Sequence, residues 1–282
     1  MHIEVKNLTH VYSEGMPFET VALADVNFTI QSGEFVCLIG HTGSGKSTLI
    51  QHMNGLLKPN EGCVLIDGKD IRQKEAGVKE MRRKIGLVFQ YPEYQLFEES
   101  VLKDVCFGPK NLGFSPEDAE ALAVKALRLV GIDPAVMGER SPFSLSGGEK
   151  RRVAIAGVLA MEPEVLILDE PTAGLDPKGH KDILRMIEDI RHDRHLTIIL
   201  ISHNMDDVAR LANHVIVMAD GRVVMDGSPA QIFSRGDELR ELGLSLPSAT
   251  HLMQSLKERG LNVQTDALTI DDAEEEILRV FG

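Results

Sequence analysis

Short continuous apolar runs alternate with segments of helical period along most of this chain. Runs of this kind are typical of strands buried on both faces of a sheet. They occur at 35–39, 85–89, 165–168 and 196–201, with a further strand expected over 63–66. Helical segments lie between them, at 47–53, 76–83, 116–130, about 149–161 and 177–192.

Two further pairs of strands are predicted to be antiparallel. Residues 2–11 and 21–30 flank a turn, and 215–218 and 223–225 flank Asp220-Gly221, a two-residue hairpin signal. Apolar runs that alternate with helices predict an α/β fold with a mostly parallel core sheet and helices on both faces. The antiparallel pairs predict a β side layer beside that sheet.

The pattern also predicts how the chain divides. Residues 113–145 form an all-helical insertion, within a helical subdomain of about 91–160. From about 237 the sequence becomes polar and helical, with helices expected over 248–259 and 271–281. We therefore expect one large α/β domain over 1–236 and a small C-terminal helical unit over 237–282.

Composition limits the partners of the chain. Among 282 residues, 30 are basic and 43 acidic, so the net charge of −13 argues against a general nucleic-acid or anionic-lipid surface. Three scattered cysteines, Cys37, Cys63 and Cys106, are typical of reduced thiols in a cytosolic protein. No leader is recognisable, and the longest apolar runs are too short to span a bilayer. Any membrane role is expected to act through a partner.

The strand at 35–39 leads into a phosphate-binding motif. Gly40 to Ser47 matches G-x-x-x-x-G-K-[ST] between a strand and a helix, which is the context that this motif requires. Glycines let backbone N–H groups curl around a phosphate, and the helix dipole adds partial positive charge there. Lys46 is expected to reach the β- and γ-phosphates, and the Ser47 hydroxyl to bind Mg²⁺. The alternative is a chance glycine-rich turn.

Three other strands end in polar residues that suit hydrolysis. Asp169 follows the strand 165–168 and is expected to hold Mg²⁺, while Glu170 is expected to act on the attacking water as general base. His203 ends the strand 196–201 and is expected to contact the γ-phosphate. Gln90 ends the strand 85–89 and is expected to reach Mg²⁺ or the water. The structural alternatives are an acidic turn, a structural histidine and a surface glutamine.

A second anion site is predicted at Leu145-Ser146-Gly147-Gly148-Glu149. A hydroxyl and two glycines at the start of a helix can bind phosphate, although a simple helix cap explains them equally. One chain cannot easily bring both anion sites to one γ-phosphate. Two chains arranged head to tail can, with Lys46 of one chain and Ser146 of the other around each nucleotide.

These motifs, in this order, resemble the ATP-binding cassette (ABC) ATPases. The resemblance covers about residues 2–235 and rests on Gly40–Thr48, Gln90, Leu145–Glu149, Leu166–Glu170, Gly174–Asp176 and His203. It implies an ABC-type P-loop fold and a dimer that sandwiches ATP. It also implies that Tyr12 stacks on adenine, where a buried strand-end tyrosine is the alternative, and that Asp176 signals between the two sites. Glu149 stands where many members have Gln, which we expect to do little harm.

The resemblance also implies the individual binding residues. Those expected to bind the nucleotide are Tyr12, Gly40, His41, Thr42, Gly43, Ser44, Gly45, Lys46, Ser47, Thr48, Ser146, Gly147, Gly148 and Asp176. Those expected to act in hydrolysis are Gln90, Glu170 and His203. Those expected to hold Mg²⁺ are Ser47, Gln90 and Asp169.

Within the ABC family the chain is most similar to the ATPase subunits of energy-coupling factor (ECF) transporters. That similarity rests on Gly40–Lys46, Phe89–Phe97, Phe107–Gly113 and Arg151–Gly157, in segments that in such transporters form the groove for a membrane partner. It implies a motor subunit of a vitamin or metal-ion importer at the cytoplasmic face of the membrane. The implied partners are a second ATPase chain, identical or not, a transmembrane coupling subunit and a substrate-capture membrane subunit. The resemblance also implies that the C-terminal unit over 237–282 forms a dimer contact.

Two other functions compete with this interpretation. A soluble ABC ATPase, such as an iron–sulfur assembly component, would share every nucleotide-binding motif. A nucleic-acid-handling relative is disfavoured by the net charge, the single cassette and the lack of long coiled-coil insertions. The aromatic stretch Tyr91–Phe97 distinguishes a transporter subunit from a soluble ABC ATPase. A coupling groove should expose this stretch, whereas a soluble ATPase need not.

Overall fold

A computed structural model of the chain describes residues 1–72, 80 and 83–281. These residues form two compact units. One unit comprises Met1 and Ile71–Ile199, and the other comprises His2–Asp70 and Leu200–Gly282. The basic helix predicted over 76–83 lies outside the described residues except for Glu80 and Arg83. Strand β8 (Thr197–Ile201) contains the point at which the chain passes between the units.

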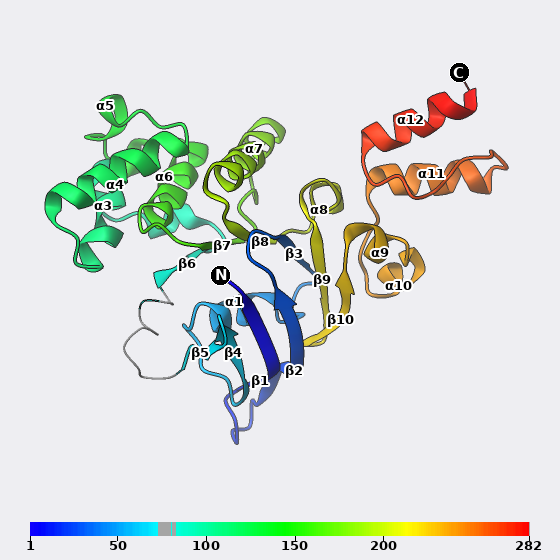
Figure 1. The fold of residues 1–282 in the computed structure, drawn as a ribbon, viewed down its shortest axis with the longest axis horizontal. Helices are drawn as coiled ribbons and strands as arrows, with labels where there is room; N and C mark the ends of the chain where they lie inside the picture. Colours follow the sequence, from blue (N-terminus) through cyan, green and yellow to red (C-terminus); the bar gives the residue numbers. More distant parts are fainter. Residues whose placement is uncertain (73–79, 81–82, 282) are drawn as a thin grey trace. The chain divides into compact units, whose positions relative to one another are not determined.

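The unit that holds the N-terminal strands contains the predicted antiparallel layer (Figure 1). Its four strands lie in the order β2-β1-β4-β5, and the pairings are antiparallel. Alternate residues of these strands are buried, as expected for a sheet with one covered face. The strands are β1 (Ile3–Tyr12), β2 (Thr20–Ile30), β4 (Glu61–Ile66) and β5 (Lys69–Asp70).

A second group of strands in the same unit carries the phosphate-binding motif. Strand β3 (Phe35–Ile39) is buried along its whole length and pairs in parallel with β9 (His214–Ala219). Strand β9 turns back antiparallel into β10 (Arg222–Gly227), and both turn residues have positive φ, as a tight hairpin requires. Helix α1 (Lys46–Met53) follows β3, and α8 (Met205–Leu211) follows β8.

The C-terminal part of this unit is entirely helical. Helices α11 (Ser248–Glu258) and α12 (Ile270–Phe281) match the two predicted segments, and α9 (Pro229–Phe233) and α10 (Gly236–Glu241) precede them. The last two helices and the loop between them share a small apolar core. Its buried members are Ala249, Met253, Val263, Ala267 and Ala273. The boundary predicted at 236–237 stays a prediction.

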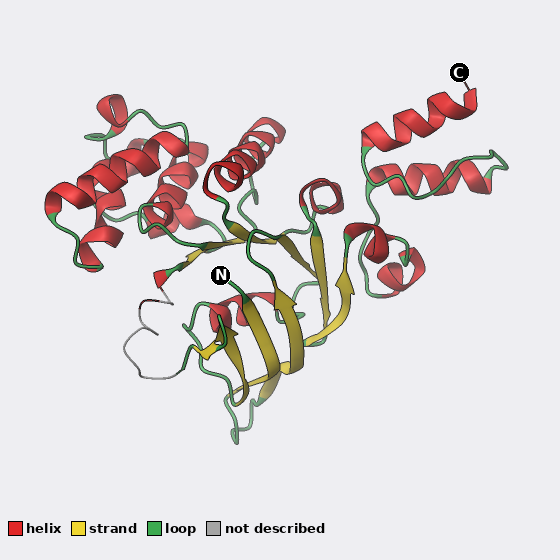
Figure 2. Ribbon diagram, viewed as in Figure 1, coloured by secondary structure: helices red, strands yellow, loops and turns green. Residues whose placement is uncertain are grey.

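The other unit contains a parallel strand pair and several long helices, which are drawn as red ribbons in Figure 2. Strands β6 (Ile85–Val88) and β7 (Val165–Asp169) pair in parallel, with Ile85 opposite Val165. Helix α3 (Val101–Asn111) precedes the predicted insertion at 113–145 and lies within the predicted helical subdomain of about 91–160. The other helices are α4 (Pro116–Leu129), α5 (Pro134–Met137), α6 (Gly147–Leu159) and α7 (Pro177–Arg194), with 3₁₀ turns η1 (Pro92–Gln95) and η2 (Pro142–Ser144).

Candidate active site

The phosphate-binding loop has a backbone that only glycine adopts without strain. Gly43 and Gly45 have φ of 84° and 100°, in the left-handed region. A Cβ atom on Gly45 would lie 2.6 Å from the Ala22 carbonyl oxygen, and one on Gly40 would lie 2.3 Å from that of Met218. The loop therefore depends on its glycines for both conformation and space, and it ends at the N-terminus of α1.

Lys46 lies inside this loop. Its side chain is 6 % exposed, and Nζ donates to the carbonyl oxygens of Gly40 at 2.7 Å and His41 at 2.9 Å. A longer bond of 3.3 Å reaches the Ser44 hydroxyl. The ammonium charge and the positive end of the α1 dipole therefore coincide in a glycine loop, which is an arrangement suited to a phosphate.

Tyr12 lies at the end of β1 in the same unit. Its side chain is 41 % exposed, so the alternative of a buried strand-end tyrosine is wrong. The hydroxyl lies 3.3 Å from the hydroxyl of Thr48, which ties the tyrosine to the helix that begins at Lys46. Its ring packs edge-on against His10, with 4.5 Å between the ring centroids. An exposed ring held in this way has a face available for stacking.

The structure brings together two residues predicted to act in hydrolysis. Glu170 directly follows β7 and has a positive φ of 48°, while Gln90 lies two residues after the end of β6. The amide Nε2 of Gln90 donates to Glu170 Oε2 at 2.9 Å. Asp169, the last residue of β7, is 8 % exposed. The parallel pairing of β6 and β7 thus brings an amide and two carboxylates to the same ends of two strands.

The predicted second anion site caps α6. The Ser146 hydroxyl accepts from the Glu149 N–H at 3.3 Å, and the Glu149 carboxylate accepts from the Ser146 N–H at 2.8 Å and hydroxyl at 2.7 Å. These donors lower the pKa of Glu149. The capping alternative is therefore realised, with the carboxylate on the same hydroxyl that is predicted to meet phosphate.

The two remaining predicted residues, Asp176 and His203, lie just before helices. Asp176 caps α7, because its Oδ1 accepts from the Gly179 N–H at 2.6 Å. His203 is exposed between β8 and the cap of α8, where Asn204 accepts from two N–H groups. Tyr12, the phosphate loop and His203 belong to one unit, and the other predicted residues belong to the second.

The Mg²⁺ ligands stay a prediction, which rests on the chemistry of the donors. A hydroxyl, an amide and a carboxylate, from Ser47, Gln90 and Asp169, are the oxygen ligands that Mg²⁺ prefers. Within the described part of the chain, no cluster of three or more His, Cys, Asp or Glu side chains offers a competing site for a metal ion.

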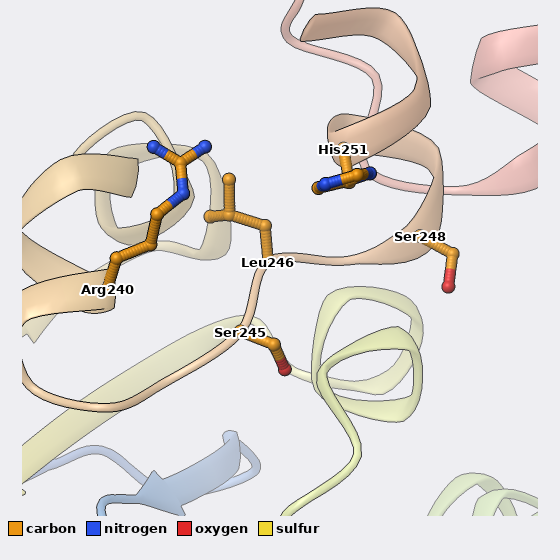
Figure 3. Close-up of a pocket in the computed structure, with 5 residues that line it drawn as sticks. All are labelled: Arg240, Ser245, Leu246, Ser248 and His251. Atoms are coloured by element: carbon orange, nitrogen blue, oxygen red, sulfur yellow. The ribbon is translucent and has the colours of Figure 1, made fainter. Parts of the chain in front are cut away.

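A pocket in the C-terminal helical region contains none of the predicted residues (Figure 3). Arg240 from α10 and His251 from α11 face it, with Ser245, Leu246 and Ser248. The guanidinium of Arg240 already donates to Asp237 and to Gln254, at 2.6 Å each. The pocket therefore offers no unpaired charge for a nucleotide.

Comparisons with known proteins identify the family of the chain. The family model described as "ABC transporter" matches residues 23–173. The chain is 57 % identical over 282 residues to the energy-coupling factor transporter ATP-binding protein EcfA2 of Clostridium tetani, covering 100 % of this chain and 98 % of that protein.

Two solved structures have the same fold. CbiO1 from Clostridium perfringens, part of the ABC transporter complex cbiONQ, is 41 % identical with a TM-score of 0.75, over 89 % of this chain and 98 % of that one. The ATP-binding cassette MJ0796, in a dimeric post-hydrolysis state bound to ADP and Pi, is 30 % identical with a TM-score of 0.71, over 80 % and 98 %.

The chain belongs to the ABC transporter family and has its α/β ATPase fold. It is an ATP-hydrolysing motor subunit of the energy-coupling factor type, as the sequence motifs predict. Throughout the part of the chain that the structure describes, no helix has the length and apolar character needed to cross a bilayer.

Proposed function

We propose that the chain couples ATP hydrolysis to uptake of a micronutrient, a vitamin or a metal ion, through membrane partners at the cytoplasmic face. One observation carries the coupling proposal. The segment that follows Gln90, whose amide bonds Glu170, exposes a series of aromatic side chains. Their exposed fractions are 43 % for Tyr91, 86 % for Tyr94, 56 % for Phe97 and 43 % for Phe107.

These aromatics form the coupling surface in our proposal. Phe97 and Phe107 contact each other edge-on, with 4.8 Å between the ring centroids, so the segment after η1 and helix α3 jointly present them. Exposed apolar groups that gather in this way mark a protein-binding surface. Gln90, which directly precedes this segment, donates a hydrogen bond to Glu170, the predicted base. The segment is thereby linked to the residues proposed to hydrolyse ATP, as a coupling motor requires. A soluble iron–sulfur assembly ATPase has no need of such a surface, so this observation favours the transporter.

The proposed chemistry assigns a task to each residue. Lys46 and the amides of Gly43–Ser47 bind the triphosphate, Tyr12 stacks on the base, and His203 contacts the γ-phosphate. Glu170 accepts a proton from the attacking water, and Gln90 orients the carboxylate. Ser47, Asp169 and Gln90 would hold Mg²⁺, which when bound neutralises charge on the phosphates.

Each active site is proposed to need a second ATPase chain. Ser146 and its two glycines would complete the site built on the partner's Lys46, in an identical or a similar chain. MJ0796 is dimeric in its nucleotide-bound structure, which supports this arrangement. The C-terminal helices carry exposed apolar side chains, among them Ile270 (75 %), Leu278 (61 %) and Phe281 (59 %), which support the proposed dimer contact there.

Co-purification tests the coupling proposal. The tagged chain is expressed with the products of neighbouring genes and extracted from membranes in mild detergent. We expect a transmembrane coupling protein, a substrate-capture protein and a second ATPase chain to co-purify. Tyr94→Ser should weaken that association while leaving ATP binding intact, and Leu56→Ser, at a position that is 59 % exposed and outside both the coupling surface and the C-terminal helices, is the control. Recovery of the chain only in the soluble fraction would contradict the proposal.

A further inference from the structure

Arg151 is an arginine with its side chain enclosed in the protein. It lies on α6, five residues after Ser146, and its side chain is only 2 % exposed. Arginine is seldom buried so completely, because removing a guanidinium from water is unfavourable unless its donors are satisfied. The partners of this side chain therefore indicate what its burial achieves.

The guanidinium binds two separate loop segments. Nη1 donates to the carbonyl oxygens of Pro171 at 2.9 Å and Ala173 at 2.8 Å. Nη2 donates to both carboxylate oxygens of Glu93, at 3.2 Å each. One rigid fork of donors thus joins the segment after β7 to the segment after β6.

These two segments carry the residues predicted to act on water. Pro171 directly follows Glu170, and Glu93 lies three residues after Gln90. Gln90 and Glu170 are themselves joined by the 2.9 Å hydrogen bond. The two segments are therefore tied together twice, once at the reacting groups and once through Arg151.

Lysine would not make the same set of contacts. The planar guanidinium offers five N–H donors in a fixed geometry, and it reaches two carbonyls and a carboxylate together. An ammonium group is a point charge with three donors, so Arg151→Lys keeps the charge of the Glu93 pair but loses the fork. This difference separates positioning from simple charge neutralisation.

We propose that Arg151 is a positioning residue for ATP hydrolysis, which fixes the segment after Glu170 against the segment after Gln90. The inference rests on the proposed function, in which Glu170 and Gln90 act on the attacking water. Arg151 also links the coupling surface to the residues proposed to act on water, because Glu93 lies between Tyr91 and Tyr94 in the sequence. Arg151 itself does not touch the reacting atoms.

The test measures kcat and KM for ATP in the purified full-length complex, normalised to folded protein. Small displacements of a reacting group lower the rate strongly, so Arg151→Lys should lower kcat about 10- to 100-fold. KM should change less than about threefold, because the change spares the phosphate loop and Tyr12. Glu93→Gln is a milder change and should lower kcat about fivefold or more. It tests the same inference if Arg151→Lys does not fold. Glu99→Gln, an exposed glutamate paired with Lys103, is the matched control.

A second measurement separates positioning from a general structural role. In single-turnover assays on a Glu170→Gln background, Arg151→Lys should cause little further loss, since both changes act on the same group. An unchanged kcat in Arg151→Lys or in Glu93→Gln, or full additivity with Glu170→Gln, would overturn the inference. If Glu170→Gln itself keeps full turnover, the proposed function fails instead, and the two failures are thereby distinguished.

Discussion

The hydrogen bond from Gln90 to Glu170 is the most direct link between single residues and the chemistry. It joins two side chains that lie eighty positions apart in the sequence, at the ends of neighbouring parallel strands. The left-handed backbone of Glu170 departs from the strand direction, and such conformations concentrate at functional sites. The hydrogen bond from Gln90 and the backbone conformation of Glu170 therefore hold the carboxylate in a defined orientation.

Glu170→Gln should separate ATP binding from hydrolysis. The amide has the same shape but accepts protons poorly, and loss of a general base lowers rates by about 10²–10⁴-fold. ATP affinity should stay within about threefold, and the ATP-bound dimer should accumulate, as seen by size-exclusion chromatography. Glu162→Gln, a glutamate paired with Lys125 in the same unit, is the matched control and should hydrolyse ATP normally. Turnover at the native rate in Glu170→Gln would refute its assignment as the base.

His52 gives the protein a predictable response to pH. It lies on α1, fully buried, and burial followed by the proximity of His10 lowers its pKa to about 4. The unfolded chain has a histidine pKa of about 6.5, so between pH 6.5 and 4 unfolding takes up a proton. The free energy of unfolding should therefore fall as the pH drops through this range, by at most about 1.4 kcal/mol per pH unit from this group.

Urea denaturation at pH 7, 6 and 5 measures this effect. His52→Phe should remove the contribution, so the difference in unfolding free energy between native protein and variant should change with pH. His251→Phe, at an exposed position on α11, should leave the pH dependence as it is. Equal pH dependence in the native protein and in His52→Phe would show that His52 does not titrate in this way.

Among the elements, buried strands were the easiest to predict. The apolar run 35–39 coincides with β3, and the run 165–168 ends one residue before the end of β7. Strands buried on both faces read as continuous apolar runs, so their position is encoded locally. The phosphate-loop motif was predictable for the same reason, because its chemistry depends on adjacent residues.

Elements and contacts that depend on distant residues were not predictable. Helix α3 was missed because Gly108 and Pro109, residues that usually end helices, lie within it. The bond between Gln90 and Glu170 and the burial of Arg151 were also missed. Hydrophobic period shows which face of an element is buried, but it does not fix irregular segments or their long-range partners.

Helix α11 is held at its first residue by α8. The carboxylate of Asp206 accepts from the Ser248 N–H at 2.6 Å and from its hydroxyl at 2.7 Å. A negative charge at the N-terminus of a helix also interacts favourably with the helix dipole. The C-terminal helices are thus anchored to a helix that begins two residues after His203.

Ser248→Ala should loosen this anchor without unfolding the protein. It removes one hydrogen bond to a carboxylate, which we expect to lower the local stability of α11 by about 1–2 kcal/mol. Hydrogen exchange should show faster exchange in α11 and little change in β3 or α1. Ser255→Ala, two turns further along the same helix, is the matched control. Equal exchange rates in α11 for both variants would show that Asp206 is not the anchor.

At the scale of the whole molecule, the chain is predicted to supply two kinds of phosphate-binding element within an acidic protein. The net charge of −13 means that a triphosphate must be bound by local groups, such as the Lys46 loop and the glycine amides after Ser146. Glu149 adds a carboxylate at the second of these elements, bonded to the Ser146 hydroxyl. In the proposed two-chain site, Ser146 would therefore exchange that bond for one to the phosphate of the partner's nucleotide.

Mixing two inactive variants tests whether each site is built from two chains. Lys46→Ala and Ser146→Ala should each hydrolyse ATP at least about 100-fold more slowly as pure proteins, because a pure dimer then lacks one element in both sites. In a mixed dimer, the chain with Ser146→Ala keeps Lys46, and the chain with Lys46→Ala keeps Ser146. One site then has both native elements, and the other has neither.

The mixture should therefore regain activity that neither variant shows alone. With two identical chains and random pairing, half of the dimers are mixed and each has one complete site, so about a quarter of the native rate is the upper limit for independent sites. Two chains altered at both positions together cannot regain activity in any pairing, which makes the double variant the control. If both elements of a site came from one chain, mixing would leave the rate at the average of the two pure variants.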